Sequence, residues 1–355
     1  MRTLHKIKYF VPFSLPFAAY IAFTERGLLT FLPIFYVFMA VPLVELFATP
    51  DDTNLSEAQD TLIKKDSFYD LLLYFIVPIQ FGLLFLFLYS MQQDALQLYE
   101  KIGRTGSMGI LCGVFGINAA HELGHRTKWH EQLMAKALLL TSLYQHFFIE
   151  HNRGHHKHVS TDQDPASARW GENVYGFWWR SVTDGYRSAW HLENTRLSQL
   201  KLPVWHYRNE MIWYHVVSVA FLAIVGLVFG FKGLVFFGIS ASIGILLLET
   251  VNYIEHYGLR RTQLANGKYE RTMPIHSWNS NHVLGRLLLF ELSRHSDHHY
   301  LASRKYQNLR HHDAAPQMPT GYPGMILLSL FSPLWFRVMH KKLDTIKIQQ
   351  ATPQV

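Results

Sequence analysis

The feature that most constrains this chain is a series of long apolar runs, each close to the length that crosses a lipid bilayer. A helix needs about 20 apolar residues to span roughly 30 Å of hydrocarbon. Six runs approach that length, and they form three pairs with short turns: 9–24 and 28–47, 71–90 and 105–120, 211–231 and 233–254. The pattern predicts an all-α integral membrane protein with six transmembrane helices in three hairpins.

The composition agrees with a membrane protein that also has a large polar part. Charged residues make up only 17% of the chain, against about 25% in ordinary soluble domains. The mean hydropathy is nevertheless only +0.03, so many residues must lie outside the bilayer. The segments 121–210 and 256–355 carry this polar mass. We expect one membrane domain over 1–355, with these segments forming a histidine-rich cap.

The distribution of basic residues predicts the orientation. If both termini, the loop 48–69 and the two polar segments share one side, that side holds 29 of the 33 Lys and Arg residues. The positive-inside rule then places the termini and the cap in the cytoplasm, at the cytoplasmic membrane. This topology accounts for the net charge of +7 without nucleic acid, so the lipid bilayer is an expected partner and nucleic acid is not.

Histidine clusters at the cytoplasmic ends of the runs predict a metal centre. The chain has 21 histidines and one cysteine, so imidazole must dominate any metal site. Nine histidines recur at helical spacings in four clusters: His121 and His125; His151, His155 and His156; His256; His295, His298 and His299. A zinc ion takes about four ligands, so nine imidazoles predict two metal ions. Imidazole binds iron, copper, zinc and nickel, so the ligand type leaves the metal open.

Acidic and amide side chains beside these clusters are candidates to orient the imidazole rings. They are Glu122, Glu150, Asp164, Glu249, Asn252, Glu255 and Asp297. Glu249 and Asn252 interrupt an apolar run, where polar groups are costly and are therefore functional candidates. Seven further histidines fall outside the repeating spacing and are not predicted as ligands: His130, His146, His158, His276, His282, His311 and His312.

The residues His121-Glu122-Leu123-Gly124-His125 also match H-E-x-x-H, the signature of zinc proteases. In that alternative Glu122 would be the general base of a membrane protease. The alternative needs only one or two further ligands and gives no role to six histidines with matching spacing. The two-metal interpretation is therefore favoured.

The complete pattern resembles a known superfamily. The order H-x3-H, H-x3-H-H and H-x2-H-H on a six-span chain is similar to the membrane non-haem di-iron desaturases and hydroxylases, and within them to alkane 1-monooxygenases. Seven blocks carry the resemblance: NAAHELGH at 118–125, HFFIEHNRGHH at 146–156, NYIEHYGL at 252–259, SWNSNH at 277–282, RHSDHH at 294–299, YQNLR at 306–310 and PTGYPG at 319–324. The block at 252–259 separates this family from desaturases.

The resemblance implies O2-dependent terminal hydroxylation of medium-chain n-alkanes, with the nine histidines holding two iron ions. It also implies two electrons from rubredoxin, as a separate protein or a fused domain. A fatty-acyl desaturase or hydroxylase with the same di-iron site is the alternative. An alkane forms no hydrogen bonds, so we expect an apolar channel between the spans, below the metal. The basic tail, including Arg304 and Lys305, is the expected docking surface for an acidic donor.

Overall fold

The computed structural model describes residues 6–351, and the side chains of residues 6–346. Within this range the chain is all-helical, and its only β-type contacts are two isolated bridges, Gln263 with Tyr269 and Asn279 with Gln317. The ends of the chain at 1–5 and 352–355, expected on the cytoplasmic side, lie outside the described residues. The predicted all-α class is therefore confirmed.

The apolar runs form helices, several of them interrupted. The N-terminal half contains η1 (Lys8–Phe13), α2 (Ser14–Thr24), η2 (Gly27–Phe31), α3 (Leu32–Phe35), the π-helix η3 (Tyr36–Ala40), α4 (Val41–Phe47), α6 (Phe68–Ser90), α7 (Leu98–Ile110), the π-helix η4 (Leu111–Ile117) and α8 (Asn118–Gly124). The last two runs form one element, α13 (Glu210–His256), of 47 residues.

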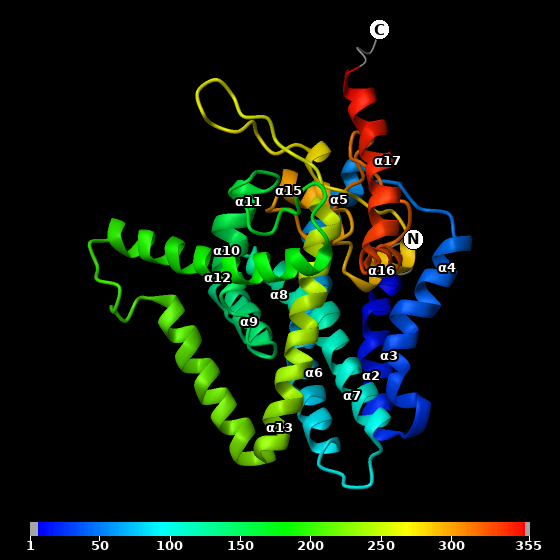
Figure 1. Cartoon of the computed structure of the whole chain (residues 1–355), viewed down its shortest axis with the longest axis vertical. Coiled ribbons are helices and arrows are strands. Elements are labelled where there is room, and N and C mark those ends of the chain that lie inside the picture. The colour runs from blue at the N-terminus through cyan, green and yellow to red at the C-terminus, as the bar shows by residue number, and fades with distance from the viewer. Residues whose placement is uncertain (1–5, 352–355) are drawn as a thin grey trace.

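Three helical stretches are long and apolar enough to cross a membrane: Gly27–Phe47, Phe68–Ser90 and Glu210–His256. The last is not one straight helix, because Gly230 has non-helical angles of φ 65° and ψ −171°. A positive φ is accessible to glycine at little cost. At this residue α13 turns back on itself, as the folded yellow-green element in Figure 1 shows. The chain is therefore a multi-pass membrane protein.

The remaining helices and the loops between them build the cap, which lies at one end of the membrane helices (Figure 1). They are α5 (Glu57–Lys64), α9 (Trp129–Leu140), α10 (Phe147–Glu150), the π-helix η5 (His151–His155), α11 (His156–His158), α12 (Val174–Gln199), η6 (Pro274–His276), α14 (Val283–Leu288), α15 (His295–Tyr300), η7 (Tyr306–Asn308), α16 (Tyr322–Ser329) and α17 (Ser332–Ala351).

Close helix packing fixes the elements that reach the cap. Along η4 and α13, a Cβ on Gly244 would lie only 3.2 Å from the backbone nitrogen of Gly113, so these backbones touch through glycines. On α7, away from the cap, the buried Arg104 donates hydrogen bonds to the carbonyls of Ala22, Glu25 and Ser90. These contacts join α2, α6, α7 and α13 into one frame below the cap.

Candidate metal centre

All nine predicted histidines meet in the cap, in two groups. The five-histidine group contains His121, His125, His151, His156 and His298, and the four-histidine group contains His155, His256, His295 and His299. Within each group one nitrogen per ring lies within 4.8 Å of the others. The residues come from α8, η5, α11, α13 and α15, so elements distant in sequence converge at one place.

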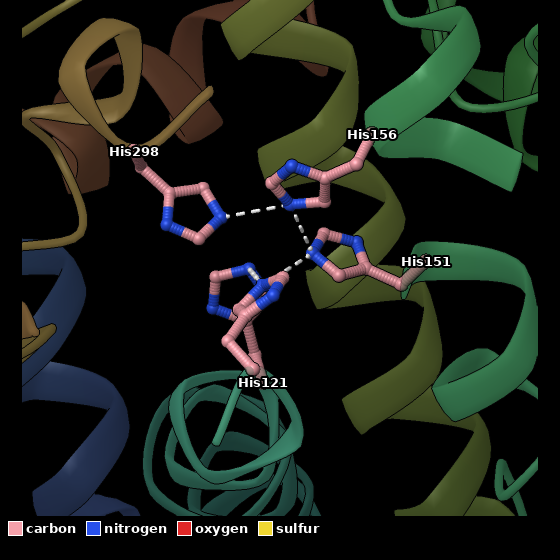
Figure 2. Close-up of side chains that lie close together, drawn as sticks. His121, His151, His156 and His298 are labelled. Carbon is pink, nitrogen blue, oxygen red and sulfur yellow. Dashed lines mark hydrogen bonds between the residues drawn. The ribbon is translucent and has the colours of Figure 1, made fainter. Parts of the chain in front are cut away.

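In the five-histidine group the Nε2 atoms face one another. The Nε2 of His151 lies 3.1 Å from that of His125 and 3.0 Å from that of His156. The Nε2 of His298 is 3.0 Å from that of His156. Figure 2 shows three rings pointing inward above His121: those of His151 and His156, from the continuous stretch η5–α11, and that of His298, from α15.

The four-histidine group repeats this arrangement. The Nε2 of His299 lies 2.9 Å from that of His295 and 3.2 Å from that of His155. The Nε2 of His256 lies 3.1 Å from that of His295. All four residues are buried, whereas His125 and His156 of the other group are only partly buried.

These separations fit rings that share a cation. Ligands held about 2.1 Å from one metal ion, at right angles to each other, lie about 3.0 Å apart. A neutral imidazole has one N–H and one lone pair, so several Nε2 lone pairs facing one another leave acceptors unpaired unless a cation lies between them. The donor set therefore fits two metal ions.

The protonation state of the rings supports the same interpretation. Burial, together with charge repulsion from neighbouring histidines, holds the pKa of five of them well below the ordinary value: His151, His156, His295, His298 and His299. Burial also lowers the pKa of His125 to about 3. These six rings are neutral at physiological pH, which is the form that binds metals.

His155 differs because it has a carboxylate partner. Its Nδ1 lies 2.9 Å from Oδ2 of the fully buried Asp164. Burial opposes a charge on His155, but the charge and hydrogen bond of Asp164 raise its pKa overall. Asp164 is held in turn by the hydroxyl of Ser167 and the backbone N–H of Ala166. This arrangement turns the Nε2 of His155 toward the other three rings.

Glu255 lies on the other side of the same group. Its Oε2 is 3.2 Å from the Nε2 of His295, while its Oε1 accepts a hydrogen bond from the hydroxyl of Tyr322. Glu255 therefore faces the inward nitrogen of a ring, not the outer nitrogen that an orienting carboxylate would contact. Tyr322 was not predicted as a site residue, although it lies in the PTGYPG block. Nothing in the sequence distinguishes this tyrosine from other tyrosines in apolar segments.

The other candidates do not contact the nine histidines directly within the described chain. Glu122 binds Arg126 and the backbone N–H of Tyr306. Asp297 binds Arg304, Arg310 and His312. Glu249 accepts hydrogen bonds from Tyr144, Ser181 and Asn252. Glu150 has one buried oxygen without a partner, and burial together with the charge of Asp164 raises its pKa to about 8.

The ion pair of Glu122 bears on the protease alternative. A general base must be able to reach a water at the metal. Glu122 instead pairs with Arg126 at 2.6 Å, and the metal-facing positions around His121 and His125 are filled by three further histidines. The H-E-x-x-H match is therefore part of a larger imidazole cluster. His282, outside the predicted set, contacts the hydroxyl of Ser280 and belongs to neither group.

An apolar cavity extends from the metal centre toward the membrane helices. Its polar end includes His121, His151, His295, Asn118, Asn252 and Glu255. Its apolar walls include Val37 and Phe38 of η3, Val114 of η4, Leu248 and Val251 of α13, and Leu288 of α14. A channel of this kind between the spans, below the metal, was expected from the sequence.

Arg304 and Lys305, expected at a docking surface, have other contacts in the structure. Arg304 binds the buried Asp297 at 2.9 Å, and Lys305 binds Asp70 at 2.7 Å. Their side chains are only 18% and 25% exposed. These ion pairs hold Arg304 against α15 and Lys305 against the first turn of α6, so both side chains are less available to a docking protein than the sequence suggested.

Comparisons with known proteins agree with this geometry. A family model described as fatty acid desaturase matches residues 105–341. Alkane 1-monooxygenase 2 of Pseudomonas aeruginosa is 42% identical, over 88% of this chain and 83% of that protein. Alkane 1-monooxygenase 1 of Alcanivorax borkumensis is 40% identical, over 87% of this chain and 78% of that protein. The hydroxylase component of xylene/toluene monooxygenase from Pseudomonas putida is 29% identical over 81% of this chain.

Proposed function

The chain belongs to the fatty acid desaturase family, among its alkane 1-monooxygenases, and is therefore an oxidoreductase of the monooxygenase class; we propose that it hydroxylates medium-chain n-alkanes at the terminal carbon. The observation that carries this proposal is the apolar cavity that ends at the nine converging histidines. Its walls offer an alkane no hydrogen bonds, so shape must select the substrate.

The nine histidines hold two iron ions in this proposal, one in each group. The iron pair supplies the activation of O2 and the transfer of one oxygen atom to the alkane. The overall reaction converts an alkane, O2, two electrons and two protons to a 1-alkanol and water. The identity of the metal rests on the family, because imidazole alone does not select iron.

The side chains of the protein have separate tasks around this centre. Asp164 holds the proton of His155 at Nδ1 and so leaves the Nε2 lone pair free to bind a metal. Glu255, fixed by Tyr322, presents a carboxylate oxygen between the four-histidine group and the cavity. Asn252, at the polar end of the cavity, donates a hydrogen bond to the buried Glu249. The leucines and valines of the wall exclude water from the reacting carbon.

The topology follows from the same apolar runs. We propose six crossings, with α2, the stretch η2–α4, α6, the stretch α7–α8 and the two limbs of α13 as membrane helices of one domain. The cap and both termini then lie in the cytoplasm, as the 29 basic residues on that side indicate. In this proposal the protein lies in the cytoplasmic membrane of the cell.

The electrons come from rubredoxin in this proposal. Rubredoxin is bound by exposed basic residues of the cap, in place of Arg304 and Lys305. Lys157, next to His156, and Arg271, whose guanidinium lies 5.0 Å from the ring of Tyr300 at the end of α15, are exposed and suited to this contact. An acidic donor would be steered toward such a surface.

The test is reconstitution of the purified protein in lipid with rubredoxin, its reductase and n-octane under ¹⁸O₂. We expect two irons per chain and 1-octanol that carries ¹⁸O. One zinc per chain together with cleavage of a peptide would overturn the proposal. Iron with a double bond introduced into an acyl chain would support the desaturase alternative instead.

A further inference from the structure

Glu45 is a buried acidic residue inside the second apolar run. It lies on α4, between Val44 and Leu46, and its side chain is 2% exposed. An ionisable group within a membrane segment is costly and needs a specific partner or function. Glu45 is distant in sequence from every histidine cluster, and the proposed reaction has so far given it no task.

The carboxylate of Glu45 points into the cap, not toward lipid. Its Oε1 accepts a hydrogen bond from the backbone N–H of Gly285 in the first turn of α14, at 2.7 Å. Its Oε2 is buried and has no hydrogen-bond partner. One oxygen thus connects a membrane helix to a cap segment 240 residues later in the chain.

Two glycines make room for this carboxylate. A Cβ on Gly285 would lie 2.9 Å from Oε1, and a Cβ on Gly321 would overlap with Oε2. Gly321 immediately precedes α16 and has φ −67°, an angle open to any residue. Space for Glu45, rather than backbone conformation, therefore explains why Gly321 has no side chain.

The segments that enclose Glu45 form one wall of the cavity. α14 contributes Gly285 and Leu288, and α16 contributes Tyr322, Pro323 and Ile326. Tyr322 also donates its hydroxyl to Glu255, which faces His295. The lining also includes Val37 and Phe38 of η3, which belong to the same apolar run as Glu45. Glu45 therefore connects the part of the cavity lining that the second apolar run contributes to the part that α14 and α16 contribute beside the metal centre.

We propose that Glu45 is a positioning residue that fixes α14 and α16 against the second membrane helix and thereby determines which carbon of a bound alkane faces the metal centre. The inference rests on the proposed alkane hydroxylation and adds a determinant of its regiochemistry. Glu45 acts through the wall and does not contact the reacting atoms. Without the Glu45 carboxylate, α14 and α16 are free to shift, and the terminal carbon of the bound alkane is held less firmly.

The first test compares products of n-octane from the wild type, Glu45→Ala, Glu45→Gln and Val44→Ala. Glu45→Ala should lower kcat/KM by about tenfold and raise the ratio of 2-octanol to 1-octanol several-fold, because the Gly285 N–H loses its acceptor. Glu45→Gln keeps an oxygen at the same place and should restore most of the wild-type ratio. Val44 is 52% exposed on the same helix, and its alanine variant should match the wild type.

The second test uses Gly321→Ala, whose added methyl group collides with Oε2. This variant should shift the product ratio in the same direction as Glu45→Ala. The double variant should be no worse than Glu45→Ala alone, since the collision disappears with the carboxylate. Additive losses would mean that Gly321 and Glu45 act independently, which would overturn the proposed contact.

The third test does not depend on turnover. Hydrogen–deuterium exchange of the purified full-length protein should become faster in 283–288 and 322–329 for Glu45→Ala, and not for Val44→Ala. If the wild type forms no octanol, the proposed function fails, while faster exchange would still support the contact. If the wild type is active but Glu45→Ala lowers only the total rate, with the product ratio unchanged, Glu45 is structural and the inference fails.

Discussion

The two histidine groups use the same ligand type but differ in their surroundings. The four-histidine group is wholly buried and is contacted by Asp164 and Glu255. The five-histidine group includes the partly buried His125 and His156, and no carboxylate contacts its rings within the described chain. The difference indicates a rigid site beside a more open one. The predictions below use this contrast, from the largest expected effect to the smallest.

Removing a ring should remove one metal ion from the affected group. We expect His299→Ala and His125→Ala each to retain about half of the iron and to lose activity by more than about 100-fold. Losing a metal ligand should cost more activity than losing a residue that only orients a ligand. Iron analysis and turnover measure this. His282→Ala is the control, because that imidazole contacts Ser280 outside both groups. Full iron in either ligand variant would remove that residue from the site.

Loss of the Asp164 carboxylate should affect only the four-histidine group. Asp164→Asn no longer accepts the Nδ1 proton of His155 as a carboxylate does, and outer partners of this kind contribute about 10- to 100-fold in metal affinity. Iron titration of the metal-free protein should show one weakened site and one unchanged site. The exposed Asp162, two residues earlier, provides the control variant Asp162→Asn. Equal weakening of both sites would contradict the separation into two groups.

A chelator should remove iron first from the five-histidine group. The two partly buried rings of this group let solvent reach the site. We therefore expect iron to be lost in two phases, one for each group, with rates that differ several-fold. In His299→Ala the remaining iron should leave at the faster rate, and in His125→Ala at the slower rate. Identical rates in both variants would show that exposure of His125 and His156 does not govern access.

Narrowing the cavity should change products without changing iron in either group. Val37→Trp adds volume to the cavity wall and should exclude the longer alkanes, each lost methylene being worth about 0.8 kcal/mol. The product profile for a series of n-alkanes measures this, with iron content as the control. An unchanged profile would place the substrate elsewhere.

The smallest expected effect concerns electron entry near the more open group. Reduction by rubredoxin should be about two- to threefold slower in Lys157→Glu and Arg271→Glu than in the wild type. Reduction of the wild type should also slow as salt rises past about 0.15 M. Arg187→Glu is the control, since the side chain of Arg187 is 78% exposed on α12 and forms an ion pair with Asp184 three residues earlier. A rate independent of salt and of these charges would mean that docking relies on apolar contacts.

The sequence predicted the convergence of the nine histidines because each cluster obeys a local rule. Residues at i, i+3 and i+4 share a helix face, so His121 with His125, and His295 with His298 and His299, needed only helix geometry. The association between clusters came from their shared position at the cytoplasmic ends of the runs and from the number of imidazoles, which exceeds what one metal ion binds. The division into five and four was not predictable, since His155 and His156 are neighbours in sequence but belong to different groups.

The carboxylates show where local reasoning fails. Asp164, Glu122 and Asp297 all lie near histidines in sequence, yet only Asp164 contacts one of the nine. The partners of the other two, Arg126 on the next turn and Arg304 beyond α15, are basic residues that a pattern of histidines does not reveal. Charge pairing depends on side-chain direction, which sequence spacing fixes only within one helix.

The sequence alone was enough to predict an all-helical multi-pass membrane protein and its imidazole donors, because bilayer thickness and helix periodicity act on each segment separately. The break at Gly230 lies at the turn predicted between the last two apolar runs, whereas only the tertiary structure decided the grouping of the rings and the contact of Glu45 with Gly285. These features depend on backbones packed at distances of a few ångströms between residues far apart in the chain. That information arises when the hairpins and the cap pack together.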